Sequence, residues 1–485
     1  MNYKMMGRFL SMILAVEAAF MVPPALIGLC EGAHFTALAF LIAILVGLAI
    51  AGGLALFSRG AAKRNFYARE GLLSVGIGWI AMSLVGCLPL WISGEFPKFI
   101  DAFFEIVSGF TTTGSSVCPN VELLSRAVNY WRCFTHWVGG MGVLVFLLAI
   151  VPADGKGSGF TMHLLRAESP GPDVGKLVPK MRQTAATLYV TYVALTVLNF
   201  LFLMAGRMSL FDAICTAFGT AGTGGFGIKA DSIAGFSPYI QWVCTIFMIL
   251  FGINFNCYYL LILKKIRSVL KDEELHLYLL TILGSAALIV LNLGSYYKTI
   301  GQTVRHAFFQ VASIITTTGF ATTDFDLWPT FSKTILLFLM VIGACAGSTG
   351  GGIKCARVLL LVKGLLRNIS QMLHPNKVQV IRVNKKPVSE RILSGVNAYL
   401  CAYVIILVFS TLILSIEKES FTTCFTAVLA CFNNIGPGLD AVGPACNFGE
   451  LSVLSKLVLI FDMLAGRLEI FPMLMLFNYR AWKKN

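Results

Sequence analysis

The sequence contains little charge. Only 13% of its 485 residues are charged, whereas 57% are hydrophobic and the mean hydropathy is +0.78. Soluble domains carry roughly 25% charged residues. Apolar runs of roughly 20 residues, the length that crosses about 30 Å of hydrocarbon, recur along the chain. This composition excludes a soluble protein and predicts an all-α, polytopic protein in a lipid bilayer.

Catalytic and cofactor-binding motifs are also absent. The six histidines form no H-E-x-x-H set, and there is no G-x-S-x-G sequence, no P-loop and no G-x-G-x-x-G fingerprint after a plausible strand. The thirteen cysteines include no C-x-x-C pair. Cys118 and Cys446 are expected in external loops, and whether they pair stays open. We therefore expect neither an enzyme nor a cofactor in this chain.

The net charge of +14 is compatible with nucleic-acid binding or with membrane topology. Lys and Arg gather in the cytoplasmic loops of membrane proteins. Here they cluster in that way, at Arg59, Lys63 and Arg64; Lys176, Lys180 and Arg182; Lys264, Lys265 and Arg267; Arg382, Lys385 and Lys386; and Lys483 and Lys484. We expect no nucleic acid partner and both termini in the cytoplasm. The first apolar segment, 10–30, lacks a small-residue cleavage site and is predicted to be a retained span.

A short motif recurs four times after two leading apolar segments at 10–30 and 36–57. Each copy starts with Phe and ends with Gly: FFEIVSGFTTTG at 103–114, FDAICTAFGTAG at 211–222, FFQVASIITTTG at 308–319 and FTAVLACFNNIG at 425–436. A bulky apolar residue lies four positions before each glycine, at Phe110, Phe218, Ile315 and Phe432. Four copies at similar spacing indicate an internal repeat.

These motif helices are too short to cross a membrane. A helix of roughly ten residues rises about 15 Å, half of the hydrocarbon thickness. Non-helical backbone at that depth is tolerated only inside protein or beside a watery cavity. We therefore expect ten spans and four re-entrant hairpins whose loops converge from outside on a central pore. The predicted units are 1–66, a leading hairpin, and four pore repeats at 67–155, 156–268, 269–372 and 373–485.

The loop composition suits a cation. Carbonyl rings replace the water shell of potassium in selectivity filters, and glycine adopts the required backbone conformations without a Cβ penalty. Half-helices also direct their partly negative C-terminal ends into the pore. Close helix packing by small residues is the alternative, although it does not explain four copies behind half-length helices. The predicted K⁺ filter comprises Thr111, Thr112, Thr113, Gly114, Thr220, Ala221, Gly222, Thr223, Thr316, Thr317, Thr318, Gly319, Asn433, Asn434, Ile435 and Gly436.

From about residue 67 to the C-terminus, these motifs resemble the superfamily of bacterial Trk and Ktr and plant HKT potassium transporters. HWVGGMGVLVF at 136–146, GTGGF at 222–226 and GACAGSTGGGIK at 343–354 carry the similarity. The leading pair of spans resembles that of TrkH-type subunits. The resemblance implies four membrane–pore–membrane units, one filter glycine in each, and potassium uptake. The fourth loop departs from the pattern because it lacks threonine, which leaves the strength of selectivity open.

The segment 343–352 interrupts a potential long helix over 331–370. Each glycine in a helix interior costs roughly 1 kcal/mol relative to alanine, and five glycines lie in this segment. Composition alone is equally compatible with a cytoplasmic loop between two shorter helices. The resemblance implies a gate loop beneath the filter, formed by Gly347, Ser348, Thr349, Gly350, Gly351 and Gly352.

Three acidic or basic positions carry further hypotheses. Arg467 lies in an apolar stretch, where a charge is a functional candidate; the resemblance implies a barrier to cations below the filter, and a local Arg–Glu pair is the alternative. Asp101 and Glu105 near the outer mouth either concentrate cations or cap a helix. Sequence alone does not decide between these readings.

The resemblance also implies partners and a location. Such proteins are homodimers in the bacterial cytoplasmic (inner) membrane, and they dock on a cytosolic, TrkA-like ring of nucleotide-binding regulatory subunits. A cation symporter of alternating-access type, coupled to H⁺ or Na⁺, is the competing class. Symporters of that class usually contain inverted repeats, whereas the charge bias here indicates four units of the same orientation.

Overall fold

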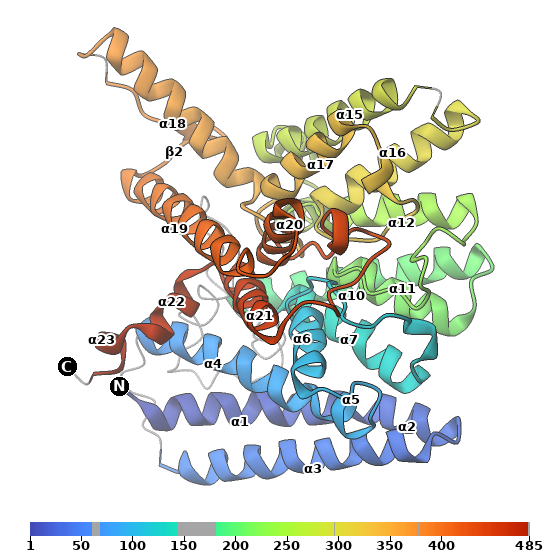
Figure 1. Ribbon diagram of the computed structural model, residues 1–485. Coiled ribbons are helices and arrows are strands. Elements are labelled where there is room, and N and C mark those ends of the chain that lie inside the picture. Colours follow the sequence, from blue (N-terminus) through green and yellow to red (C-terminus); the bar gives the residue numbers. More distant parts are fainter. Residues whose placement is uncertain (61–67, 143–180, 295, 377, 484–485) are drawn as a thin grey trace.

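A computed structural model describes residues 1–60, 68–142, 181–294, 296–376 and 378–483, which are mostly helical (Figure 1). The chain starts with α1 (Tyr3–Phe20) and α2 (Val22–Cys30), and it returns along α3 (His34–Phe57). Gly32, with a φ of 74°, lies in the turn between α2 and α3. These helices form the lower edge in Figure 1, as the predicted leading hairpin.

Four groups of helices follow in the same order, each with a short helix of 12–16 residues that carries the repeated motif. The bounds are α4 (Ala68–Gly86), α5 (Leu88–Ile92), α6 (Phe99–Phe110) and α7 (Arg126–Met141); α10 (Met181–Ala205), α11 (Leu210–Gly222), α12 (Pro238–Phe251), α13 (Phe255–Ile262) and α14 (Ile266–Val269); α15 (Glu273–Leu293), α16 (Ile300–Ile315), α17 (Thr330–Ile342) and α18 (Cys355–Leu373); and α19 (Glu390–Leu414), α20 (Phe421–Phe432), α21 (Val453–Arg467), α22 (Phe471–Phe477) and α23 (Tyr479–Trp482).

Three of the four short helices start after residues that cap them, whereas α6 has no side-chain cap. Ser209, Thr299 and Ser420 precede α11, α16 and α20, and each side chain accepts a hydrogen bond from the backbone N–H three positions later. Such caps satisfy the orphan donors of a first helical turn. In three groups the loop that follows the short helix also contains one 3₁₀ turn, at Val121–Leu123, Phe325–Leu327 and Asp440–Val442.

Among the described residues, six helices are long and apolar enough to cross a membrane, and the bent pair α12–α13 would make a seventh. The helices α7, α17 and α21 have 16, 13 and 15 residues, below the length of roughly 20 that a span requires. The count of ten spans therefore stays a prediction. So do the boundaries of the five units, of which 66/67 and 155/156 lie outside the described residues.

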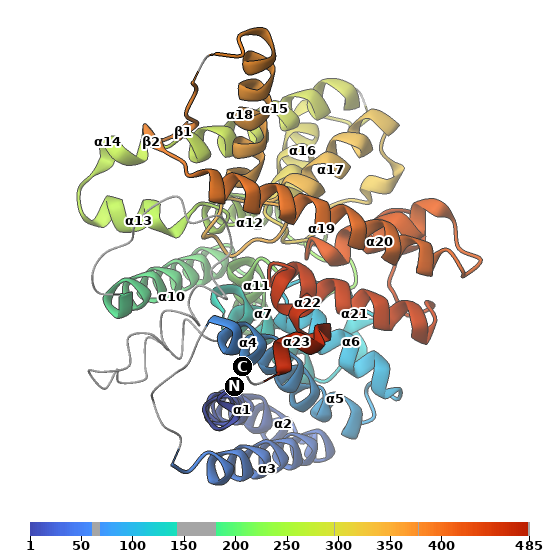
Figure 2. The ribbon, with the colours of Figure 1, turned by 90° about the vertical axis from the view of Figure 1, so that its left-hand side faces the viewer.

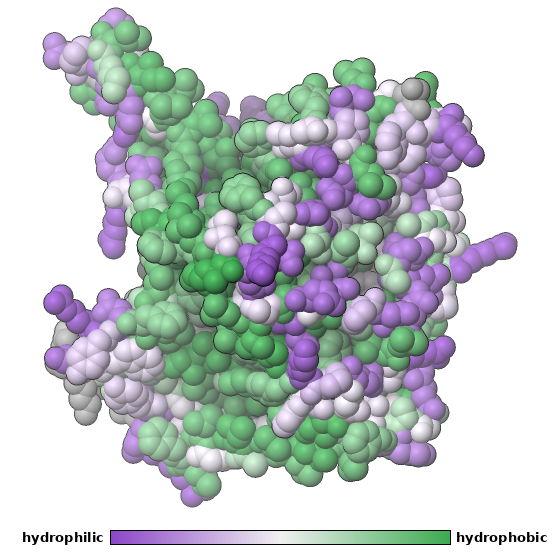
Figure 3. Space-filling model, viewed as in Figure 1, coloured by the Kyte–Doolittle hydropathy of each residue, from purple (hydrophilic) through white to green (hydrophobic). Residues whose placement is uncertain are grey.

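The distribution of polar and apolar side chains is the reverse of that in a soluble protein. Large apolar side chains of long helices face outward, with Leu45 66% and Leu291 77% exposed, whereas Thr111 and Thr317 are fully buried. Figure 3 shows a broad hydrophobic band left of the centre and along the lower edge, with hydrophilic side chains from the centre to the right margin and at the left extremities. A lipid solvent favours this arrangement.

The predicted break in the segment 331–370 is present. The helix α17 ends at Ile342 and α18 begins at Cys355, so the intervening glycine-rich segment is a loop. A two-stranded hairpin, β1 (Arg382–Val383) and β2 (Lys386–Pro387), connects α18 to α19. Both chain termini lie on the side of the molecule to which α18 and the hairpin point (Figures 1 and 2).

Candidate functional site

The four short helices end in loops with the same backbone path. A residue at the end of each helix adopts a left-handed conformation, with φ of 55° at Thr112, 53° at Thr223, 58° at Thr317 and 55° at Asn434. Thr223 is the C-cap of α11, whereas the other three residues directly follow their caps. In every loop the N–H of the following residue reaches back to a carbonyl five positions earlier, as Thr113 N does to Ser108 O at 2.9 Å. This bonding closes the helix ends in a Schellman-like turn.

The second loop corrects the predicted register. A glycine with positive φ follows the left-handed residue by two positions, and these glycines are Gly114, Gly225, Gly319 and Gly436. Gly222 instead ends α11, where a Cβ atom would lie 2.2 Å from the carbonyl oxygen of His136. Thr220 and Ala221 are likewise in the last turn of α11. The Phe-to-Gly spacing that aligned the second copy with the others was therefore coincidental.

The four glycines close a ring. A Cβ atom on Gly114 would lie 1.9 Å from the carbonyl oxygen of Gly224, one on Gly225 would lie 2.0 Å from that of Thr318, and one on Gly319 would lie 2.0 Å from that of Ile435. A Cβ atom on Gly436 would lie 2.9 Å from the carbonyl oxygen of Thr113. Each loop therefore packs its glycine against the backbone of the next loop, and the fourth packs against the first.

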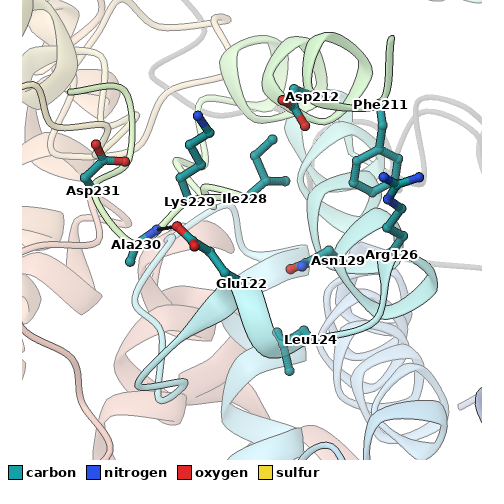
Figure 4. A pocket seen from close by; sticks show the side chains of 10 residues that line it. All are labelled: Glu122, Leu124, Arg126, Asn129, Phe211, Asp212, Ile228, Lys229, Ala230 and Asp231. Atoms are coloured by element: carbon teal, nitrogen blue, oxygen red, sulfur yellow. Dashed lines mark hydrogen bonds between the residues drawn. The ribbon is translucent and has the colours of Figure 1, made fainter. Parts of the chain in front are cut away.

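The same four glycines line a cavity of about 190 Å³, together with residues that follow them in the loops. Cys118 and Cys446 also line it, and both thiols are free, so the possible pairing of these cysteines is not present. A second depression of about 520 Å³ lies alongside, where Glu122 accepts a hydrogen bond from Ala230 N at 3.2 Å (Figure 4). This second depression contains none of the four glycines.

A buried ion pair supports the first loop. Arg132 and Glu105 have side chains that are 1% and 0% exposed, and the Arg132 Nε–Glu105 Oε1 distance is 2.8 Å. Glu105 also accepts hydrogen bonds from Ser116 Oγ and Val117 N, both at 2.9 Å. The alternatives for Glu105, cation concentration at the mouth and helix capping, are both wrong because this carboxylate is occupied inside the protein.

Asp101, the other acidic candidate, pairs with Lys456 at 2.7 Å.

Sequence reasoning missed Arg132, although a charge within an apolar segment is the signal that pointed to Arg467. The guanidinium of Arg132 also lies 4.3 Å from the centre of the Phe226 ring. The Arg132 side chain therefore connects the first loop, through Glu105, with Phe226 of the second loop.

His136 joins the same two loops. Its Nε2 accepts a hydrogen bond from Phe226 N at 3.1 Å, so Nδ1 carries the proton and donates to Gly109 O at 2.8 Å. A neutral imidazole is required for this arrangement because a protonated Nε2 cannot accept. His136 belongs to the motif 136–146, of which residues from 143 onward lie outside the described part.

Hydroxyl groups fill the space behind the first and third loops. Thr111 and Thr113 form a hydrogen bond at 2.8 Å, and Thr316 and Thr318 repeat it at the same distance. The equivalent positions are glycines in the second loop and Asn433 and Ile435 in the fourth. The four loops therefore share a backbone while their side chains differ.

The glycine-rich loop between α17 and α18 lies directly beneath the ring. Gly351 N donates to Thr317 Oγ1 at 2.6 Å, and a Cβ atom on Gly351 would lie 2.3 Å from Asn433 O. A Cβ atom on Gly350 would lie 2.8 Å from Thr316 O. Ser348 donates to Cys345 O, and Thr349 donates to Phe251 O at 3.3 Å. Glycine is required where this segment contacts the third and fourth loops of the ring.

Arg467 lies at the same level. It donates to Thr349 O at 2.9 Å and to Gly140 O at 2.8 Å, so it ties the glycine-rich loop to the end of α7. Glu469 forms its ion pair with Arg357, which follows that loop. The pairing alternative, in which Arg467 and Glu469 form a local structural pair, therefore receives no support from these contacts.

A sequence model of the TrkH family, described as cation transport proteins, matches residues 38–483. The chain belongs to this family. It is 36% identical to the Trk system potassium uptake protein TrkH of Escherichia coli K12, over all of both chains, and 34% identical, again over all of both, to the protein of that name from Halomonas elongata. The crystal structure of the potassium transporter TrkH from Vibrio parahaemolyticus matches all of both chains with a TM-score of 0.87 and 32% identity.

The family confirms the resemblance drawn from the motifs, and it is a class of transporters. Together with the long apolar helices, it makes the chain a multi-pass membrane protein. The roles of the individual loop, gate and arginine residues stay predictions.

Proposed function

We propose that this protein takes up potassium ions through a channel-like pore at the centre of the four-loop ring. The observation that carries the proposal is the closed set of glycine–carbonyl contacts from Gly114 to Gly225, Gly319 and Gly436 and back. A dehydrated cation needs oxygen ligands in place of water. In this proposal, the carbonyl oxygens of the four loops face a common axis and replace the water shell of the ion.

Helix dipoles add to the attraction for cations. The C-terminal ends of α6, α11, α16 and α20 all lead into the loops, and a helix C-terminus carries a partial negative charge. The names of the relatives, which are potassium uptake proteins, support K⁺ as the ion. A glycine in each of four loops is the arrangement associated with K⁺ over Na⁺ in the resembled superfamily.

The loop 347–352 acts as the gate in this proposal, together with Arg467. Its contacts with Thr317 and Asn433 leave it directly below the filter, and the Arg467 guanidinium adds a positive charge there. Both features oppose cation passage. A cytosolic nucleotide-binding, TrkA-like ring would open the gate, and two copies of the chain would form the dimer in the bacterial inner membrane with their termini in the cytoplasm.

An alternating-access symporter is the second candidate, and broken helices such as α12–α13 are its supporting observation. Conductance separates the two, because a pore passes ions faster than a rocking carrier turns over. Single-channel steps in planar bilayers would support the pore. Uptake that strictly requires an H⁺ or Na⁺ gradient, without such steps, would contradict it.

The first test is ⁸⁶Rb⁺ uptake into proteoliposomes, with K⁺, Na⁺ and Li⁺ as competitors. The filter proposal predicts competition by K⁺ and little by Na⁺. Equal competition by Na⁺ would contradict K⁺ selectivity. Deleting Gly347–Gly352 tests the gate separately: uptake without regulator should rise, and unchanged flux with unchanged regulation would sink the gate assignment.

A further inference from the structure

A buried carboxylate reaches both ends of the loop assigned above as the gate. Glu274, in the first turn of α15, is 8% exposed. Its Oε1 accepts hydrogen bonds from Ala346 N at 2.6 Å and from Ala356 N at 3.1 Å. Ala346 directly precedes the loop 347–352, and Ala356 follows it in the first turn of α18. One oxygen atom therefore holds the two chain segments that enter and leave the loop.

The bond to Ala356 also fixes the start of α18. The first N–H groups of a helix lack partners within it, and they carry a partial positive charge that favours a carboxylate. The residue at the N-cap position, Lys354, makes no side-chain cap bond. Glu274 supplies that cap from another helix, so its hydrogen bonds fix the positions of α18 and of the loop relative to α15.

The two acidic residues before Glu274 contact other parts of the protein. Asp272 caps α15 through Leu275 N at 2.9 Å. Glu273 accepts a hydrogen bond from Asn384 N in the β-hairpin at 3.0 Å and forms an ion pair with Lys363. Of these three successive acidic residues, Glu274 is the one whose carboxylate contacts the flanks of the loop. Glu273 is consequently a matched control.

Neutral backbone bonds also attach the loop and its flanks. Cys345 N donates to Gly252 O at 3.1 Å, and Phe255 N donates to Gly347 O at 3.0 Å. These are neutral backbone bonds, whereas hydrogen bonds to a charged acceptor contribute roughly twice as much. Charged side chains also hold the loop itself, because Arg467 donates to Thr349 O at 2.9 Å and Lys354 Nζ donates to Gly350 O. Withdrawal of the loop from below Thr317 requires these bonds to break, and it also requires the two bonds of Glu274 to break or α15 to move with the loop.

We propose that Glu274 is a positioning residue of transport, whose carboxylate holds the gate loop closed by clamping its two ends. This inference rests on the proposed gating role of Gly347–Gly352. Removing the clamp shifts the loop toward conformations in which it leaves the filter. The effect on the closed state should be on the order of tenfold, as expected for losing a charge-assisted hydrogen bond inside a protein.

The experiment compares Glu274→Ala, Glu274→Gln and Glu273→Gln in full-length protein reconstituted without regulator. The first readout is ⁸⁶Rb⁺ uptake. The second is the rate at which N-ethylmaleimide modifies Cys345 and Cys355, measured by mass spectrometry of peptides, because these thiols flank the loop and are 1% and 0% exposed. Glu274→Gln removes the charge but keeps one acceptor oxygen, and it remains available as a test if Glu274→Ala fails to fold.

We expect uptake and labelling of both thiols to rise together on the order of tenfold in Glu274→Ala and by less in Glu274→Gln, with Glu273→Gln at the wild-type level. A merely stabilising cap would lower thermal stability without raising uptake, which would overturn the proposal. So would equal effects of Glu274→Gln and Glu273→Gln. Deleting Gly347–Gly352 in parallel separates the two hypotheses. If the deletion raises uptake and Glu274→Gln changes neither readout, the gating role of the loop is supported and the role of Glu274 is refuted. If the deletion changes nothing, the gating role of the loop is itself refuted.

Discussion

A Cβ atom on Gly225 would lie 2.0 Å from the carbonyl oxygen of Thr318, and Gly225 itself has a φ of 73°. Both facts require glycine, because real Cβ atoms do not approach a backbone oxygen so closely and L side chains are strained at such φ values. The contact joins the second loop to the third. It identifies Gly225 as the second-repeat counterpart of Gly114, Gly319 and Gly436.

Replacing Gly225 by serine should impair the pore. The new side chain must displace the backbone at Thr318, so we expect K⁺ uptake to fall about tenfold and the preference for K⁺ over Na⁺ to decrease, as for a displaced binding oxygen. The measurement is ⁸⁶Rb⁺ uptake with Na⁺ competition. Gly284→Ala is the control, since a Cβ atom there would meet nothing within 4 Å. If folded Gly225→Ser keeps the wild-type preference for K⁺ over Na⁺, the assignment of Gly225 as the ring glycine of the second repeat is refuted.

Arg467→Ala should conduct faster. The substitution removes a positive charge and the bonds to Thr349 O and Gly140 O, so it lowers the barrier and loosens the gate loop. We expect an increase of roughly three- to tenfold in single-channel conductance or Rb⁺ flux, equivalent to about 1 kcal/mol. Arg480→Ala, at an exposed position in α23, should leave flux unchanged. Equal or lower flux in well-folded Arg467→Ala would argue against a barrier.

The buried pair Arg132–Glu105 should be essential to stability. Glu105→Gln leaves an uncompensated guanidinium in the interior, which typically costs on the order of 3 kcal/mol. We expect a lower thermal midpoint of the detergent-solubilised protein, monitored by size-exclusion fluorescence. Replacing Arg132 by Met as well should recover part of the loss. Glu31→Gln is the control, because its partner Arg126 has a side chain 66% exposed and such pairs contribute little; an equal effect of both substitutions would contradict the prediction.

A cationic methanethiosulfonate reagent applied from outside should slow Rb⁺ uptake. Cys118 and Cys446 line the cavity that the four loop glycines share, and modification adds positive charge above the filter. We expect at least a severalfold decrease, following the electrostatic cost of like charges in a narrow pathway. The double variant Cys118→Ser, Cys446→Ser should resist the reagent. Inhibition only from the cytoplasmic side would reverse the proposed orientation.

Patterns local in sequence predicted much of this architecture. Apolar length predicted the long helices α3, α10, α15 and α19, and glycine density predicted the break between α17 and α18. The repeated motif predicted α6, α11 and α20, whereas α16 begins at Ile300, ahead of its motif. These features depend on hydrocarbon thickness and on the backbone freedom of glycine, which act on short stretches of chain. The motifs at 222–226 and 343–354 were sufficient to indicate the family.

The tertiary structure decided which residues meet. The sequence contains glycine at both 222 and 225, and only the packing of α11 against α7 places the first in a helix and the second in the ring. The ion pair between Arg132 and Glu105 and the two bonds of Glu274 likewise join residues whose separations follow no local period. Burial in a low-dielectric interior obliges charged and polar groups to find partners. The sequence determined that such partners were needed, and the fold alone selected them.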